Sequence, residues 1–144
     1  QKYRVEREYE EPAAKAMIVV DRVRRALVNL LLNACQAMPD GGTLTVIIRT
    51  AARGDGALVG VRDDGPGVPA ADLERIFTPF FSTKPSGTGL GLAIVRSIAE
   101  EHEGRVEVEN GPGRGATFWL SLGTGERDGE HGGGGRGPIH SIAP

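Results

Sequence analysis

The sequence predicts a small domain that combines α-helices with β-strands. Two stretches place apolar residues at the spacing of an amphipathic helix, and five others are rich in residue types that favour strands. Four of those five form two pairs, each joined by a glycine-containing turn. The length of 144 residues is that of one domain, and 39% hydrophobic with 25% charged residues suits a soluble globule.

Charge and cysteine content argue against several classes of protein. The net charge of −2 gives no electrostatic basis for binding nucleic acid or an anionic membrane. Cys35 is the single cysteine, so an internal disulfide is excluded and a reducing, cytoplasmic compartment is expected. No apolar run reaches the roughly 20 residues of a membrane span. The chain starts at Gln1 without a signal-like segment. We therefore interpret it as a monomeric piece of a longer protein, which is itself soluble or membrane-anchored.

The first predicted elements are an edge strand and a long helix. Residues 1–10 alternate in part and carry charge, which is typical of an edge strand. Asp21 is a good N-cap, and apolar residues then recur with helical spacing up to Met38. The helix is expected to stop at residues 39–42, a Pro-Asp-Gly-Gly sequence that is a strong breaker.

This helix carries an unusual polar stripe formed by Arg25, Asn29, Asn33 and Gln36. Asparagine costs roughly half a kcal/mol relative to alanine in a helix interior, so lysine or glutamate would serve a solvated face better. Carboxamide oxygens one turn apart suit phosphate chemistry or Mg²⁺, which prefers oxygen ligands. A solvated face and a ligand site both remain open from these residues alone.

A hairpin and an acidic turn follow. Residues 43–50 and 57–62 are rich in β-branched residues and are expected to pair across a turn at 51–56. The second strand runs into Asp63-Asp64-Gly65-Pro66-Gly67. These residues are common in turns, which is one interpretation. The other is a carboxylate directed into a pocket, where it can accept a hydrogen bond from an exocyclic amine.

A glycine-rich loop before the second long helix is the strongest sign of a ligand. A short helical turn at 72–76 and a phenylalanine cluster at 77–81 lead into residues 82–92, where Lys84 precedes Gly87, Gly89 and Gly91. Alternating glycines let backbone N–H groups approach a ligand, and a helix N-terminus attracts anions. The pattern therefore favours a polyphosphate over a flexible linker. It fits neither a dinucleotide-binding fingerprint nor a P-loop, because no strand precedes it and no Gly-Lys-Ser/Thr occurs.

The remaining elements are a helix, a hairpin and a tail. The helix is expected from about Thr88 to Glu101, with His102 at its end as a surface residue without chemistry. Residues 105–110 and 116–122 are expected to form the second hairpin, with Trp119 half-buried. Residues 1–122 thus form the domain. Residues 123–144 are rich in glycine and poor in apolar residues, so we expect this tail to be disordered.

Four of these motifs, taken in order, resemble the N, G1, F and G2 boxes of the catalytic, ATP-binding domain of two-component sensor histidine kinases. They are Asn29-Leu30-Leu31-Leu32-Asn33-Ala34, Asp63-Asp64-Gly65-Pro66-Gly67, Phe77-Thr78-Pro79-Phe80-Phe81 and Gly87-Thr88-Gly89-Leu90-Gly91-Leu92. The resemblance covers residues 5–122. The amino-acid sequence of these motifs is most similar to that of the nitrogen-regulation subgroup. It implies the Bergerat-type ATP-binding fold of the superfamily shared with gyrase and a heat-shock chaperone. This fold is a two-layer α/β sandwich, a mixed and mostly antiparallel sheet of about five strands with three helices on one face.

The resemblance also implies a role for individual residues. Asn33 matches the Mg²⁺ ligand, Asp63 the acceptor for the adenine amino group, and Lys84 a lysine of the lid that reaches the phosphates. Asn29, Asn33 and Lys84 would be the catalytic residues. The implied nucleotide contacts are Asn29, Asn33, Asp63, Gly65, Gly67, Lys84, Gly87, Thr88, Gly89, Leu90, Gly91, Leu92 and Thr117.

The function implied by this resemblance is transfer of the γ-phosphoryl group of ATP to a histidine on a separate dimerisation domain. No acceptor-histidine motif is present here, so the acceptor would lie elsewhere in the parent chain, and a response-regulator receiver domain would be the next partner. Asn29 stands where ATP-hydrolysing relatives carry a glutamate base, which argues against a gyrase-type hydrolase. The alternative that stays open is a nucleotide-dependent protein-binding module, similar to an anti-sigma factor or a degenerate nucleotide sensor.

Overall fold

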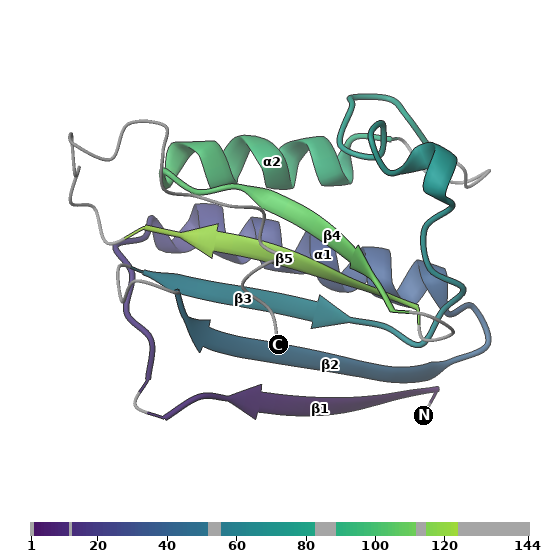
Figure 1. Cartoon of the computed structure of the whole chain (residues 1–144), viewed down its shortest axis with the longest axis horizontal. Helices are drawn as coiled ribbons and strands as arrows, with labels where there is room; N and C mark the ends of the chain where they lie inside the picture. The colour runs from purple at the N-terminus through teal and green to yellow at the C-terminus, as the bar shows by residue number, and fades with distance from the viewer. Residues whose placement is uncertain (1, 12, 52–55, 83–88, 112–114, 124–144) are drawn as a thin grey trace.

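The structure is a computed structural model that describes residues 2–11, 13–51, 56–82, 89–111 and 115–123 (Figure 1). Within these ranges, five strands form one sheet, and two α-helices lie against one of its faces. The elements in chain order are β1 (Tyr3–Tyr9), α1 (Val20–Ala37), β2 (Gly42–Thr50), β3 (Ala57–Arg62), the 3-10 helix η1 (Ala70–Asp72), α2 (Gly91–Glu101), β4 (Val106–Asn110) and β5 (Ala116–Leu122). The predicted α/β sandwich is confirmed.

The sheet is mixed and mostly antiparallel, as expected. Its strand order is β1-β2-β3-β5-β4, which places β1 at an edge. β1 pairs in parallel with β2, with Tyr3 opposite Gly42, whereas β2–β3, β3–β5 and β5–β4 are antiparallel. Both predicted hairpins, β2–β3 and β4–β5, are present, and β5 lies between β3 and β4 and pairs with both. That insertion brings the loop after β3 next to the start of β5.

Both α-helices bury an apolar stripe against the same face of the sheet. Val23, Ala26, Leu30 and Ala34 of α1 follow the spacing of one helix face and are at most 5% exposed. They pack with α2 and with alternate residues of β3 and β5 in one continuous core. Full burial of a leucine-sized side chain stabilises a fold by about 1.5–3 kcal/mol. The polar stripe of α1 therefore faces away from this core, beside the end of β3.

The third predicted helix is shorter than expected. Among the described residues, the stretch between β3 and α2 contains η1 (Ala70–Asp72) and successive turns up to Phe77. α2 starts at Gly91 rather than near Thr88, and Thr88 lies outside the described residues. Gly89 has φ +76°, which is incompatible with a right-handed helix. The start of α2 is therefore set by the backbone conformation of this glycine.

His102 is buried, which corrects its prediction as a surface residue. It is 7% exposed, and its Nε2 accepts a hydrogen bond from the N–H of Val19 at 3.0 Å. Its Nδ1 lies 2.8 Å from the carbonyl oxygen of Ile98, so Nδ1 carries the proton and donates. Asp21 is not the N-cap of α1. The helix starts at Val20 with Val19 as its N-cap, and His102, the C-cap of α2, binds the N–H of Val19 in place of a local side chain.

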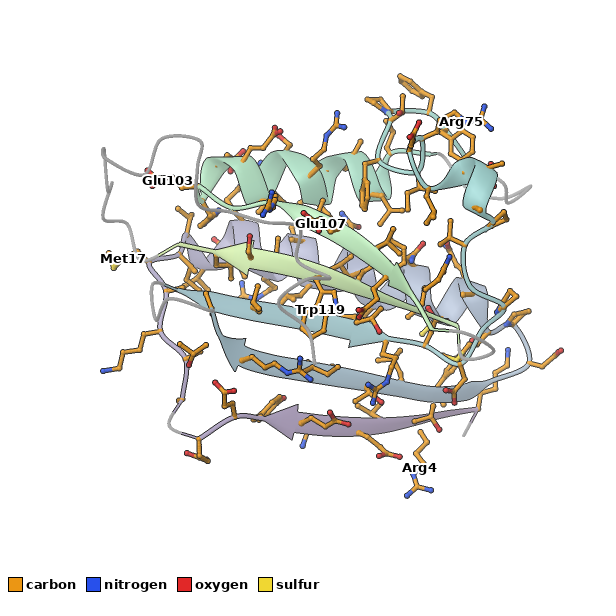
Figure 2. All side chains as sticks on the ribbon, in the orientation of Figure 1. Arg4, Met17, Arg75, Glu103, Glu107 and Trp119 are labelled. Carbon is orange, nitrogen blue, oxygen red and sulfur yellow. The ribbon has the colours of Figure 1, made fainter. Side chains whose placement is uncertain are left out.

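Trp119 is more buried than expected, at 2% exposure. Its side chain lies on the face of the sheet turned away from the helices, with Ile47 and Leu58 (Figure 2). The indole covers Gly60, where an added Cβ would lie 2.7 Å from the ring. The guanidinium of Arg49 stacks 5.2 Å from the ring centroid.

The described domain extends by one residue into the predicted tail. The N–H of Gly123 donates to the carbonyl of His102 at 3.1 Å, and its own carbonyl accepts from Met17. Residues 124–144 lie outside the described residues, so disorder of the tail stays a prediction. Within the described ranges, neither helix combines the length and apolar character needed to cross a membrane.

A bidentate ion pair joins the start of α1 to the end of α2, and its removal should destabilise the domain less in acid than at pH 7. Arg22 donates to both carboxylate oxygens of Glu101 at 2.9 and 2.6 Å. These hydrogen bonds hold the pKa of Glu101 below its ordinary value of 4.5. A carboxylate whose pKa is lowered in the folded state stabilises the fold at pH values above its ordinary pKa. That stabilisation is lost as the pH falls through the lowered pKa.

We therefore expect Arg22→Ala to lower the Tm slightly at pH 7, since an exposed ion pair contributes little. The difference from the unmodified domain should shrink below about pH 4. Circular dichroism melts between pH 3 and 7 would measure it. Arg24→Ala is the control, because Arg24 pairs with Asp21 of the same helix. A Tm difference for Arg22→Ala that persists unchanged at pH 3 would contradict the assigned cause.

Candidate functional site

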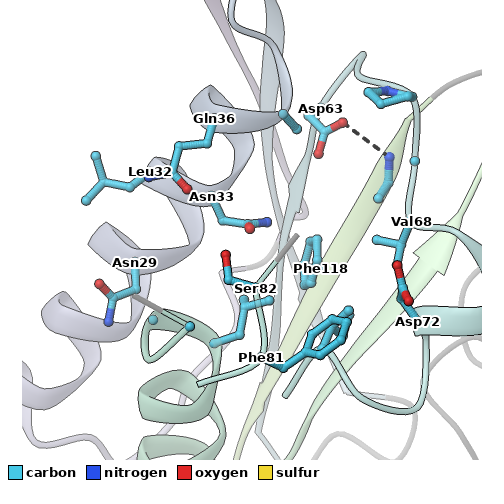
Figure 3. A pocket seen from close by; sticks show the side chains of 18 of the residues that line it. Asn29, Leu32, Asn33, Gln36, Asp63, Val68, Asp72, Phe81, Ser82 and Phe118 are labelled. Atoms are coloured by element: carbon cyan, nitrogen blue, oxygen red, sulfur yellow. Dashed lines mark hydrogen bonds between the residues drawn. The ribbon is translucent and has the colours of Figure 1, made fainter. Parts of the chain in front are cut away.

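A cavity of about 790 Å³ opens between α1, the end of β3 and the segment that follows it. Side chains from four distant parts of the chain line it (Figure 3). The lining residues are Asn29, Leu32, Asn33, Gln36, Ala37, Pro39, Asp63, Pro66, Gly67, Val68, Pro69, Asp72, Ile76, Phe81, Ser82, Gly89, Gly91, Leu92, Ala116 and Phe118. The volume is in the range that holds a drug-sized ligand or nucleotide.

The first wall of the cavity is the polar stripe of α1. Asn29, Asn33 and Gln36 line the cavity together with Leu32, and Arg25 is not among the lining residues. Figure 3 shows Asn33 extending from α1 towards the middle of the cavity, with Ser82 on the facing segment. Placement therefore favours the ligand-site interpretation of these residues over the solvated face.

Asp63 occupies the end of the cavity where β3 stops. It is 1% exposed. Its Oδ1 accepts hydrogen bonds from the N–H of Gly65 at 2.8 Å and from the N–H of Ala116 at 3.3 Å. Its own N–H donates to the carbonyl of Ala116 at 3.0 Å. These bonds fix the carboxylate at a set angle, and a carboxylate with about four lone-pair positions can also accept from a ligand.

Two glycines allow the backbone to approach this carboxylate. Gly115 has φ +73°, and an added Cβ would contact the Asp63 carbonyl and lie 2.5 Å from its Oδ1. Gly65 is not among the residues that line the cavity, but a Cβ there would lie 2.7 Å from the carbonyl of Ala37. Gly65 therefore contributes to the site by allowing close packing of the backbone beside Asp63.

The second wall is formed by the segment after β3. Val68 and Phe81 supply its apolar part, and Ser82 a hydroxyl. The guanidinium of Arg75 lies 4.9 Å from the centroid of the Phe81 ring and 3.2 Å from a carboxylate oxygen of Asp72. The guanidinium over the ring face restrains the Phe81 side chain.

The start of α2 closes the cavity on a third side. Gly89, Gly91 and Leu92 line it, and Leu90 is the N-cap of the helix. The carbonyl of Gly89 accepts from the N–H of Phe80 at 2.7 Å, which ties this end of the glycine loop to the phenylalanine cluster. The start of α2 thus lies beside the cavity, and the N–H groups of a first helical turn, which have no acceptor within the helix, attract anions.

One predicted contact does not reach the cavity. Thr117 is absent from the lining residues, whereas its neighbours Ala116 and Phe118 are present. Successive side chains of a strand point to opposite faces of the sheet. Thr117 therefore lies on the face away from the helices, and its role as a ligand contact stays a prediction. Lys84, Gly87 and Thr88 lie outside the described residues.

Several lining residues were not among the predicted nucleotide contacts. Gln36 belongs to the polar stripe, so its helical spacing with Asn29 and Asn33 was the available signal. Phe118 packs edge-to-face with Phe77 at 6.2 Å between ring centroids. Its place at the cavity depends on the insertion of β5 beside β3, which strand patterns do not reveal. Val68, Asp72 and Ser82 come from irregular segments without a periodic signal.

Comparison with known proteins decides the family. A sequence profile for the family described as "Histidine kinase-, DNA gyrase B-, and HSP90-like ATPase" matches residues 18–126. The chain belongs to this family. The match covers α1, the acidic turn, the glycine loop and the second hairpin, which together build the cavity.

Curated relatives narrow the type within the family. The domain is 47% identical over 111 residues to the sensor histidine kinase ZraS of Klebsiella oxytoca, a match over 75% of this chain and 24% of ZraS. It is 40% identical over 102 residues to sporulation kinase A of Bacillus subtilis, over 71% of this chain and 16% of that kinase. The chain therefore spans a quarter or less of these relatives.

Solved structures agree with the relatives. The catalytic domain of the histidine kinase ThkA has a TM-score of 0.76 at 30% identity, covering 85% of this chain and 80% of that one. Full-length ShkA in complex with AMPPNP has a TM-score of 0.74 at 30% identity, covering 87% of this chain and 27% of ShkA. The chain is thus an ATP-binding catalytic domain of the histidine kinase type.

Proposed function

We propose that this histidine kinase domain binds Mg²⁺-ATP in the cavity and transfers the γ-phosphoryl group to a histidine on another domain of its parent chain. The observation that carries the proposal is convergence. Asp63, the amides of α1 and the glycines before α2 are far apart in sequence, yet all line the same cavity. Phosphoryl transfer depends on positioning and charge neutralisation more than on covalent chemistry by the protein.

Each wall has a task in this proposal. The Asp63 carboxylate accepts from the exocyclic amine of adenine, because its backbone contacts hold it at the closed end of the cavity. The N–H groups at the start of α2 bind the phosphates. Phe81 and Val68 cover the nucleotide with apolar surface and exclude water. Lys84, Gly87 and Thr88 are proposed to add a cation and further donors, as expected from the sequence.

The amides of α1 fit a magnesium ion. Asn29, Asn33 and Gln36 present carboxamide groups on one side of the helix beside the cavity. Within the described ranges, no cluster of three histidine, cysteine, aspartate or glutamate side chains forms a metal site. Mg²⁺ commonly takes one or two protein oxygens and completes its shell with water and phosphates. Bound there, it would neutralise phosphate charge, and Asn33 would hold it against α1.

Asn33→Ala should therefore weaken binding of Mg²⁺-ATP by at least about tenfold, the equivalent of one hydrogen bond or ligand contact. Binding of metal-free ATP should change far less, because the lost group contacts the metal. Calorimetry with a non-hydrolysable ATP analogue, in magnesium and in EDTA, measures both. Equal losses in the two buffers would remove the metal role of Asn33.

Phosphotransfer to an added acceptor tests the function itself. The domain would be incubated with γ-labelled Mg²⁺-ATP and a purified dimerisation domain from its relative ZraS. We expect label on the acceptor that is lost in acid and kept in alkali, as for phosphohistidine. ATP binding without transfer, together with capture of a sigma factor, would instead support the protein-binding module. A cytoplasmic location and a response-regulator partner follow from the kinase proposal.

A further inference from the structure

Asn110, at the end of β4, holds the backbone of Val68 with both ends of its side-chain amide. Its Oδ1 accepts from the N–H of Val68 at 2.9 Å, and its Nδ2 donates to the carbonyl of Val68 at 2.7 Å. One amide thus makes the two hydrogen bonds that a neighbouring strand residue would make. The two residues are 42 apart in the sequence, so the contact joins the outer strand of the sheet to the segment after β3.

The segment held in this way is one wall of the nucleotide cavity. Pro66, Gly67, Val68 and Pro69 all line it. The two prolines have no N–H to donate, so Val68 is a position at which this wall can pair with the sheet in both directions. Gly67 has φ +83°, and an added Cβ would lie 3.1 Å from Oδ1 of Asn110. The side chain of Asn110 is therefore packed against the wall as well as bonded to it.

We propose that Asn110 is a positioning residue for the base of the nucleotide. It does not line the cavity itself. By fixing Val68 it sets the gap between this wall and the Asp63 carboxylate, where the proposed function places adenine. The inference rests on that proposed function. It predicts that Asn110 affects binding of the base selectively. Loss of the Asn110 contact should weaken binding of the base and leave binding of the phosphates at the start of α2 nearly unchanged.

Ser121 provides a matched contact elsewhere on the same strands. Its Oγ accepts from the N–H of Arg105 at 2.9 Å and donates to the carbonyl of Arg105 at 3.3 Å. This is also a side chain that pairs with both backbone groups of one residue. It lies where β5 ends and the chain enters β4, which is the opposite end of both strands from Asn110 and the cavity. Ser121→Ala therefore removes a similar contact without touching the nucleotide wall.

The variant Asn110→Asp tests the two hydrogen bonds individually. The aspartate keeps an acceptor for the N–H of Val68, but when ionised it places an oxygen against the Val68 carbonyl. Protonation restores a donor there. The ordinary pKa of aspartate is about 3.9. The loss of binding in the variant should therefore become smaller as the pH falls towards that value.

Calorimetry of the whole chain with ADP, and competition by pyrophosphate, tests the proposal at pH 8 and pH 5. Circular dichroism would check folding at both values. At pH 8 we expect Asn110→Asp to weaken ADP binding about tenfold relative to the unmodified chain, as for loss of one to two hydrogen bonds. Pyrophosphate binding should change less than twofold. At pH 5 the loss for ADP should be smaller than at pH 8, and Ser121→Ala should bind ADP normally at both values.

The outcomes distinguish this inference from the proposed function. Failure of the unmodified chain to bind ADP would overturn both. ADP binding by the unmodified chain with no weakening in Asn110→Asp would overturn the role of Asn110 alone. Equal losses for ADP and pyrophosphate, or weakening by Ser121→Ala as well, would show a general structural effect and likewise overturn it.

Discussion

Asp63→Asn is expected to weaken adenine-nucleotide binding by about 100-fold or more, which corresponds to loss of a charged hydrogen bond and an unfavourable donor pairing. Oδ1 of Asp63 is held by the N–H groups of Gly65 and Ala116. An asparagine would keep its carbonyl oxygen on these donors. Its NH₂ group would then face the amine of adenine, so two donors would meet where a donor and an acceptor are required.

Calorimetry with ADP measures this loss. Asp64→Asn is the matched control, because it makes the same change at the next residue. Asp64 accepts from the N–H of Thr43 at 3.1 Å and does not line the cavity. We expect less than a twofold effect there. Retained affinity in Asp63→Asn would count heavily against the adenine assignment, and equal losses in both variants would indicate a general charge effect.

Gly115→Ala should lower the stability of the domain and disrupt the cavity together. A non-glycine residue at positive φ costs about 1–2 kcal/mol, and overpacking adds about 1–3 kcal/mol. The added methyl group would contact the carbonyl and Oδ1 of Asp63 and lie 2.7 Å from the N–H nitrogen of Gly65. Two of these three atoms belong to the backbone, so relief requires movement of the acidic turn. We expect the Tm to fall by about 10 °C, by the usual relation between free energy and Tm.

Thermal unfolding measured by circular dichroism gives this shift. Gly91→Ala is the control for stability, because an added Cβ at Gly91 meets no atom within 4 Å. Alanine also favours the helical conformation that Gly91 adopts in α2. Its Tm should stay constant or rise. A Tm for Gly115→Ala within about 2 °C of the unmodified domain would show that the turn adapts without strain, since that change is below about 1 kcal/mol.

Most of the fold could be predicted from the sequence because its signals are local. Strand alternation and turn residues located β3 and β5 at the bounds that the structure has, and helical spacing placed α1 to within two residues at its start. His102 was misjudged for the same reason. It lies four residues after Ile98, on the buried face of α2, but its polar side chain suggested the surface. Its partner, the N–H of Val19, is 83 residues away.

The candidate site was predicted in its parts and not in its assembly. The polar stripe with Asn29 and Asn33 allowed a solvated face as well as a ligand site, and Asp63 allowed a simple turn. Their common cavity depends on β5 inserting beside β3, which brings Ala116 to Asp63 and Phe118 to the wall. Thr117 is next to Ala116 in β5 but does not line the cavity, because successive strand side chains point to opposite faces of the sheet.

By itself, the sequence determined the type and order of most secondary-structure elements, the family resemblance and the chemical types of the groups available to a phosphate ligand. These depend on residue type and on spacing within a single element. Tertiary structure alone decided which groups share a cavity, which face Thr117 occupies, and that Asn110 holds the wall at Val68. Such contacts join segments tens of residues apart, and their geometry is set by the packing of the whole sheet against α1 and α2.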